Sequence, residues 1–254
     1  MAITIELTDA NNDGTGVNFA AYLGNYDSSF SLGYWGFFND PSAGMFQGSE
    51  FAFSNSTQSS LTTPISSAYQ SVIFEAAAGN SLQYDFATHV LAGSVDAFSL
   101  GHGLSYSATT DSFSNASDIA FSGLGLSGSG SGNAVHNLVY GLMTGNLTSL
   151  YSLLNSNDLV FISSTGNDVL SGYAGQDTFV FNTGSGNDVV NNFASGTDLL
   201  DVSGWGVTDF SQLAVSSDGT NSLIAYGSDL IVLAGVASVD ADDFVFADQL
   251  LLAA

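Results

Sequence analysis

The sequence predicts an α+β domain over residues 1–157, with an antiparallel sheet and helices on one face, followed by an all-β calcium-binding β-roll and cap over residues 158–254. Three observations support this prediction. Apolar residues recur at helical spacing in parts of the first segment, between stretches that alternate as strands do. A nonapeptide repeat begins near residue 163. Asp is also more frequent after residue 157, so we expect the boundary between Asn155 and Ser163.

Three helices are expected in the first domain, where apolar residues recur at intervals of three to four. They cover Val17 to Phe30, Val135 to Leu142 with an end near Gly145, and Leu147 to Leu154. Strands are expected where Gly or Asn separates alternating segments, at residues 50–53, 71–76, 82–86, 90–98 and 119–121. The tripeptide Gly101-His102-Gly103 is expected to be a tight connection.

The charge of the chain limits its partners. The sequence has no Lys or Arg, and its 24 Asp and Glu residues give a formal net charge of −24. Phosphates therefore cannot be neutralised by side chains, which excludes nucleic acid as a partner. Cysteine is absent, so disulfides and thiolate metal sites are excluded. Because no Lys or Arg is available as an ion-pair partner, a buried carboxylate must contact backbone N–H groups, water, the α-amino group, histidine or a metal ion. Calcium is the metal that suits oxygen ligands.

Two nonapeptides stand in register, at residues 163–171 and 172–180. Each fits G-G-x-G-x-D-x-U-x with substitutions, and Asp168 and Asp177 hold the sixth position. A further Gly-rich turn contains Asp188, although the Asp spacing changes from 9 to 11 residues and the array loses its phase. Such turns bring carbonyl and carboxylate oxygens together around a hard cation. Asp168, Asp177 and Asp188 are thus the expected calcium ligands, and ordinary hairpins are the alternative.

Residues 160–246 closely resemble the calcium-binding RTX repeats and cap of proteins exported by type I secretion. In that family the export signal lies at the C-terminus, and the final residues, 248–254, are similar to such a tail. The resemblance implies the type I secretion machinery as a partner. The start of the chain is not a Sec signal peptide. The His-Glu-x-x-His motif of the proteases that often precede this cap is missing.

Residues 17–155 resemble the HasA-type hemophores, which are secreted haem carriers. Two stretches carry the resemblance: residues 79–104, where Tyr84 precedes a short loop that ends at His89, and residues 136–145, which read His-Asn-Leu-Val-Tyr-Gly-Leu-Met-Thr-Gly. The resemblance implies binding of haem b, haemoproteins as its source, an outer-membrane haem receptor, a secreted, extracellular location and no catalytic step. A calcium-dependent adhesion or surface-layer module that has lost haem binding is the alternative.

Tyr84 is the candidate ligand of the haem iron, with His89 as its partner. Ferric iron favours an anionic oxygen, which a tyrosinate supplies. A histidine that accepts the phenol proton strengthens the iron–oxygen bond. Without the resemblance, a half-buried strand tyrosine beside an unrelated histidine would be the simpler interpretation. His136, in the second predicted helix, is expected to be structural.

Many hemophores place a second axial histidine after the first helix, but residues 31–50 contain none. This stretch offers aromatic side chains instead, among them Tyr34, Phe37 and Phe38. They are candidates to cover a porphyrin face, and packing in the core or in a loop is the alternative. The sixth iron ligand is therefore left open.

Overall fold

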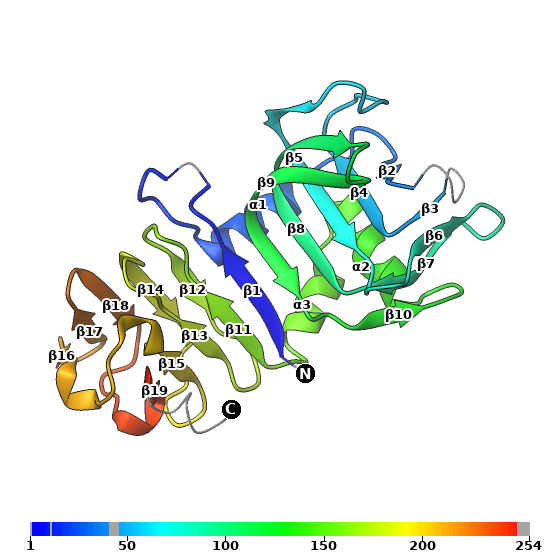
Figure 1. The fold of residues 1–254 in the computed structure, drawn as a ribbon. Helices are drawn as coiled ribbons and strands as arrows, with labels where there is room; N and C mark the ends of the chain where they lie inside the picture. Colours follow the sequence, from blue (N-terminus) through cyan, green and yellow to red (C-terminus); the bar gives the residue numbers. More distant parts are fainter. Residues whose placement is uncertain (1, 11, 41–45, 248–254) are drawn as a thin grey trace. The chain divides into compact units, whose positions relative to one another are not determined.

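The computed structural model describes residues 2–10, 12–40 and 46–247 (Figure 1). Its contacts divide the chain into two compact units. The central unit is Leu23–Leu153, and the terminal unit joins Met1–Tyr22 to Leu154–Ala254. Residues 1–22, assigned above to the first domain, thus share a unit with the C-terminal strands. The two predicted domains, 1–157 and 158–254, remain a prediction about independent folding.

The central unit contains two groups of antiparallel strands. One has the strand order β9-β8-β5-β4-β2 and the other the order β10-β7-β6-β3. The first group consists of β2 (Phe37–Phe38), β4 (Glu50–Ser54), β5 (Ile65–Glu75), β8 (Ala97–Ser107) and β9 (Ser112–Ser122). The second consists of β3 (Gln47–Gly48), β6 (Leu82–Asp85), β7 (Val90–Val95) and β10 (Leu126–Gly128).

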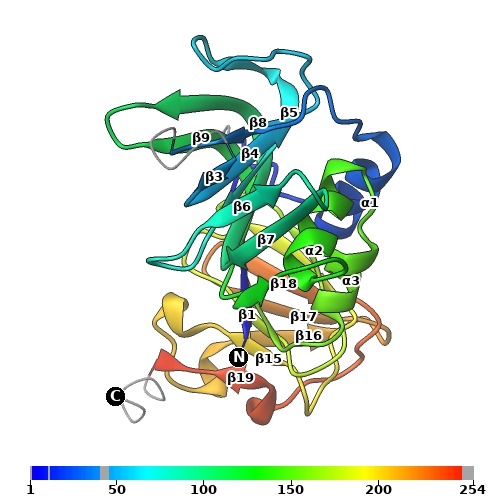
Figure 2. The same cartoon turned by 90° about the vertical axis from the view of Figure 1, so that its right-hand side faces the viewer.

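The three predicted helices are confirmed as α1 (Phe19–Ser29), α2 (Ala134–Met143) and α3 (Thr148–Leu154). Asn133 begins α2, because its side chain accepts a hydrogen bond from the His136 N–H. The buried residues of α2 recur every three or four positions, and the helix packs against β7 and β10 (Figure 2). The α+β class of this part of the chain is thereby confirmed. Within the described residues, no helix is long and apolar enough to span a membrane.

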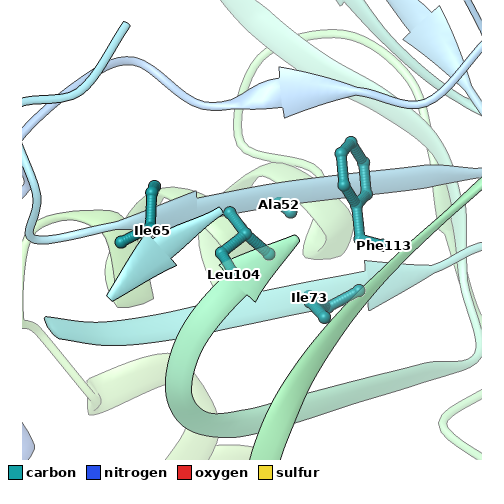
Figure 3. Close-up of a cluster of buried hydrophobic side chains, with 5 residues drawn as sticks. All are labelled: Ala52, Ile65, Ile73, Leu104 and Phe113. Carbon is teal, nitrogen blue, oxygen red and sulfur yellow. The ribbon is translucent and has the colours of Figure 1, made fainter. Parts of the chain in front are cut away.

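A hydrophobic cluster fills one side of the larger group of strands (Figure 3). Ala52 and Ile73 are cross-strand partners in it, and Ile65 and Leu104 are another pair. Phe113 packs beside them. Because alternate residues of a strand share a face, the cluster fixes the register of β4, β5 and β8.

The terminal unit is built mainly from parallel strands. One group has the order β1-β11-β13-β15-β19 and is parallel throughout, and the other has the order β12-β14-β18-β17-β16. The first consists of β1 (Ile3–Leu7), β11 (Leu159–Ile162), β13 (Thr178–Val180), β15 (Leu199–Asp201) and β19 (Phe244–Val245). The second consists of β12 (Val169–Ser171), β14 (Asn187–Asn191), β16 (Ala214–Ser217), β17 (Ser222–Tyr226) and β18 (Asp229–Leu233). Short 3-10 helices lie at Ser203–Trp205, Phe210–Gln212 and Ala241–Asp243.

The chain in the terminal unit passes from one group of strands to the other through Gly-rich turns. Leu170 and Phe179, the apolar residues of the two nonapeptides, are completely buried. The N-terminal segment repeats the same path: β1 pairs with β11, and Asn18 forms a parallel bridge with Val169. Residues 3–18 are therefore the first coil of this β-structure.

Candidate functional site

Tyr84 and His89 lie at the two ends of the loop that joins β6 to β7. The Tyr84 hydroxyl and His89 Nδ1 are 2.9 Å apart, which is hydrogen-bond distance. Tyr84 is half-buried and His89 is exposed. The proximity of these two side chains, predicted from the sequence, is thus present in the structure. It leaves a phenol oxygen beside a proton acceptor at the surface of the central unit.

Asp85 holds the loop between them in shape. Its carboxylate accepts hydrogen bonds from the Ala87 N–H (2.8 Å) and the Thr88 hydroxyl (2.7 Å). The Thr88 hydroxyl, followed by the Ala87 N–H, holds the pKa of Asp85 below its usual value. His89 then adopts a left-handed backbone with φ of 56°, which turns the chain into β7. These features orient the imidazole toward the phenol.

Two further aromatic residues adjoin the tyrosine. The Phe86 ring meets the Tyr84 ring edge to face at 5.0 Å and the Phe46 ring at 4.1 Å. Phe86 is 54% exposed and Phe46 37% exposed, which is unusual for such large apolar side chains. Neither Phe46 nor Phe86 was predicted from the sequence to belong to the site. The spacing of two between Tyr84 and Phe86 was the available signal, since strand residues two apart share a face.

His136 connects helix α2 to β7, the strand that pairs with β6 at Tyr84. Leu91, the cross-strand partner of Tyr84, donates its N–H to His136 Nδ1 at 3.2 Å. The Leu91 carbonyl accepts from the Asn133 side chain at 3.0 Å. The imidazole also stacks on Tyr140, with ring centroids 5.3 Å apart. His136 is therefore a structural support behind the hairpin, in agreement with the expectation.

The other predicted aromatic residues are associated with β2. Tyr34 and Phe37 stack on each other at 5.9 Å, and Phe38 packs on Phe51 at 4.8 Å. Phe37 also packs against the cluster of Figure 3. Core packing thus accounts for part of the surface of Phe37 and Phe38, whereas Tyr34 is 38% exposed. A role for these residues in covering haem stays a prediction.

The predicted calcium ligands are buried and hydrogen-bonded to backbone. Asp168 accepts from the N–H groups of Val17 and Ser164, both at 2.6 Å. Asp177 accepts from those of Leu159 (3.1 Å) and Tyr173 (2.7 Å). Asp188 Oδ1 accepts from the Asp168 N–H at 2.8 Å. Each carboxylate thus joins adjacent coils of the terminal unit.

These hydrogen bonds require the backbones of adjacent coils to approach closely. A Cβ on Gly16 would collide with the Asp168 carboxylate, so only glycine lets the first coil lie so near. Within residues 2–10, 12–40 and 46–247, no group of three or more His, Cys, Asp or Glu side chains is placed to hold a metal ion. The hydrogen bonds of the repeat aspartates fit a structural role, and the assignment of Asp168, Asp177 and Asp188 as calcium ligands stays a prediction.

The pH dependence of stability tests the burial of Asp188. Burial raises its pKa to about 7, and the charges of Asp168 and Asp229 act in the same direction. An unfolded chain ionises the group near its ordinary pKa of about 4. The stability that the protonated group contributes is therefore present below about pH 4 and lost as the pH rises through about 7. We expect the free energy of unfolding, measured with urea in the presence of chelator, to change less between about pH 4 and pH 7 in Asp188→Asn than in the wild type. An equal change in both proteins would contradict the burial of Asp188.

The chain is similar to several known proteins. The family model described as heme-binding protein A (HasA) matches residues 16–200. Hemophore HasA of Serratia marcescens is 32% identical over 151 residues, which cover 53% of this chain and 80% of that protein. Among solved structures, apo hemophore HasA from Yersinia pestis is 22% identical, with a TM-score of 0.46, and covers 61% of this chain and 87% of its own. The AlgE6R2 subunit of the Azotobacter vinelandii mannuronan C5-epimerase is 30% identical over 36% of this chain and 72% of its own, with a TM-score of 0.31.

The sequence comparisons define a haem-binding class of protein. The chain belongs to the HasA family, since the family match spans most of it. HasA hemophores are secreted, so the predicted extracellular location is confirmed. The match continues to residue 200, beyond residue 155, where the predicted resemblance ends. The predicted export tail, residues 248–254, lies outside the described residues.

Proposed function

We propose that this protein captures ferric haem outside the cell through Tyr84 and delivers it to an outer-membrane haem receptor. One observation carries the proposal: a member of the HasA family holds a tyrosine hydroxyl 2.9 Å from a histidine ring nitrogen at an exposed hairpin. Haemoproteins as the source of haem and type I secretion as the export route are part of the same proposal, on the strength of the family and repeat resemblances.

In this proposal Tyr84 Oη would bind the iron as a tyrosinate, and His89 Nδ1 would take up the phenol proton. An anionic oxygen suits ferric iron, and the hydrogen bond to the second residue orients the ligand. Asp85 keeps the loop closed behind this pair through its two hydrogen bonds. Hydrogen bonds that hold a binding loop in one conformation reduce the conformational entropy lost on binding.

The exposed aromatic rings suit the apolar face of a porphyrin. Phe46 and Phe86 present large apolar surfaces next to Tyr84, and such rings gain free energy when a planar ligand removes them from water. Tyr34, Phe37 and Phe38 are proposed to add contact from the β2 region. Together these side chains would hold the macrocycle while Tyr84 holds its iron.

The decisive experiment is a titration of the full chain with hemin, followed at the Soret band. We expect a saturable spectral change at one haem per chain, with a ferric spectrum typical of a tyrosinate ligand. A non-saturable change, equal to that of hemin with an unrelated acidic protein, would overturn the proposed function. Transfer of bound haem to vesicles that carry an outer-membrane haem receptor then tests delivery.

The salt dependence of haem binding tests how the propionates are held. The sequence offers them no Lys or Arg, and the chain repels them through its net charge of −24. Salt screens this repulsion, because the Debye length falls from about 30 Å at 0.01 M to about 3 Å at 1 M. We expect hemin affinity to stay constant or rise over this range. Marked weakening would reveal an attractive electrostatic contact. It would refute the arrangement in which apolar side chains hold the porphyrin and the propionates face solvent.

A further inference from the structure

A pocket of about 260 Å³ lies within the terminal unit. The end of β1 and the residues that follow it line one part of the pocket, and the turns after β11 and β13 line the rest. All lining residues except Leu7 carry an oxygen atom in the side chain, among them Glu6, Asp9, Ser163 and Asn182. The pocket is thus a concentration of oxygen donors where the first coil meets the repeat turns.

Asp9 and Ser163 are two lining side chains with a buried oxygen atom that has no hydrogen-bond partner. A third, Ser185, lies beside Asp188, where it opposes the rise that burial causes in the pKa of that carboxyl. Asp9 and Ser163 are each only 7% exposed, and neither Asp9 Oδ1 nor Ser163 Oγ has a hydrogen bond within the described structure. The other Asp9 oxygen accepts the Gly14 N–H at 2.9 Å, which fixes the carboxylate in place. Buried polar atoms are nearly always satisfied, because leaving one unpaired costs the free energy of its lost hydration. The two atoms therefore point to a ligand.

The local charge indicates the sign of that ligand. The buried carboxyl of Asp168 has its pKa raised by burial, and the charge of Asp9 adds to this rise. Glu6, which is exposed, adds a further negative charge at the pocket. The sequence contains no Lys or Arg to balance them. A cation would satisfy the unpaired oxygens and remove the repulsion between the two aspartates.

We propose that this pocket binds a hard divalent cation of the calcium type, with Asp9 as its carboxylate ligand and Ser163 as a hydroxyl ligand. Calcium accepts six to eight oxygen ligands of mixed kind in flexible geometry, including water. The pocket has room for the ion and several bound waters, each of which occupies about 30 Å³. The site differs from the one predicted at Asp168, Asp177 and Asp188, because Asp9 lies outside the repeats and keeps one oxygen free.

The test compares melting temperatures of the full chain in chelator and in calcium at constant ionic strength. With calcium at about one hundred times its Kd, we expect the wild-type melting temperature to rise by roughly 5 °C. Asp9→Asn should lose this rise, yet melt in chelator at or above the wild-type temperature, because Asn keeps the acceptor for Gly14 and removes the unpaired charge. The control is Asp242→Asn, an exposed position in the same unit that loses the same charge and should keep the full rise.

Isothermal titration with calcium chloride supplies the second readout. We expect one calcium site per chain in the wild type and in Asp242→Asn, and at least tenfold weaker binding in Asp9→Asn and Ser163→Ala. Absence of calcium binding by the wild type would overturn the proposal and leave ordered water as the partner of these oxygens. Unchanged binding by Asp9→Asn would overturn it as well and return the ion to the repeat aspartates. Magnesium and sodium, titrated in parallel, are expected to bind more weakly.

Discussion

Tyr84→Phe is expected to lower hemin affinity by more than about 100-fold and to abolish the tyrosinate features of the ferric spectrum. The substitution removes the oxygen proposed to bind iron and keeps the ring that packs against Phe86. Loss of a residue that orients a metal ligand without binding the metal itself typically lowers the affinity for the metal by about 10- to 100-fold. His89→Ala should fall in that smaller range, since His89 supports the ligand without bonding iron. Competition between each variant and the wild type for limiting hemin measures both effects.

Tyr69→Phe is the matched control for this experiment. Tyr69 lies in β5 of the same unit, is 42% exposed and loses the same hydroxyl group. It should bind hemin as the wild type does. Unchanged hemin affinity in Tyr84→Phe would remove Tyr84 from the iron site, and a greater loss in His89→Ala than in Tyr84→Phe would make His89 the ligand instead.

Asp177→Ala is expected to destabilise the terminal unit by about 3–5 kcal/mol. The carboxylate accepts the N–H groups of Leu159 and Tyr173, and its side chain is completely buried. Hydrogen bonds to charged groups contribute about 1.5–3 kcal/mol each, and the two N–H groups would have no acceptor after the change. Because domains are stable by only about 5–15 kcal/mol, the loss is a large part of the total. Asp177→Asn keeps one acceptor oxygen and should lie between Ala and the wild type.

Trp205 provides a local signal for this measurement. It belongs to the terminal unit and is 4% exposed, whereas Trp35, in the central unit, is 78% exposed. In a Trp35→Phe background, the red shift of Trp205 emission in urea reports unfolding of the terminal unit alone. The exposed Asp242→Ala should unfold as the parent does. An equal urea midpoint for Asp177→Ala and its parent would contradict the structural role of the carboxylate.

The sequence predicted those parts of the fold whose pattern is local. Helix α2 illustrates this: its apolar spacing and its end near Gly145 both depend on neighbouring residues, and both are confirmed. The predicted helix over Leu147 to Leu154 likewise became α3 (Thr148–Leu154). The pair of Tyr84 and His89 was found for the same reason, since the two residues lie five apart in one hairpin.

Long-range features were harder to predict. Gly101-His102-Gly103 was expected to be a connection, but it lies inside β8 beside an irregularity in the pairing with β9. That prediction was wrong because the glycines serve a close strand contact: a Cβ on Gly101 would collide with the Ala116 carbonyl. His102 Nδ1, in β8, lies 3.0 Å from Asp118 Oδ2, in β9.

The irregular spacing of the repeat aspartates also has a long-range explanation. Successive aspartates belong to opposite sides of a coil, so spacings of 9 and 11 are not a loss of phase. The hydrogen bonds join residues one full coil apart, namely Asp168 to Asp188, 20 residues on, and Asp177 to Asp198, 21 residues on. No window of nine residues could show this period. The backbone N–H groups that donate to these carboxylates belong to adjacent coils, so the sequence alone could not show these hydrogen bonds.

The place of β1 in the terminal unit has a consequence for biosynthesis. Ile3 pairs with Leu159, so the first strand made must wait for a partner more than 150 residues later. At about 5–20 residues per second, a ribosome needs on the order of ten seconds or more to supply that partner. The contiguous central segment, Leu23–Leu153, emerges in full during this interval and can fold first. Assembly of the terminal unit then follows and is slow, because such distant pairing raises the contact order.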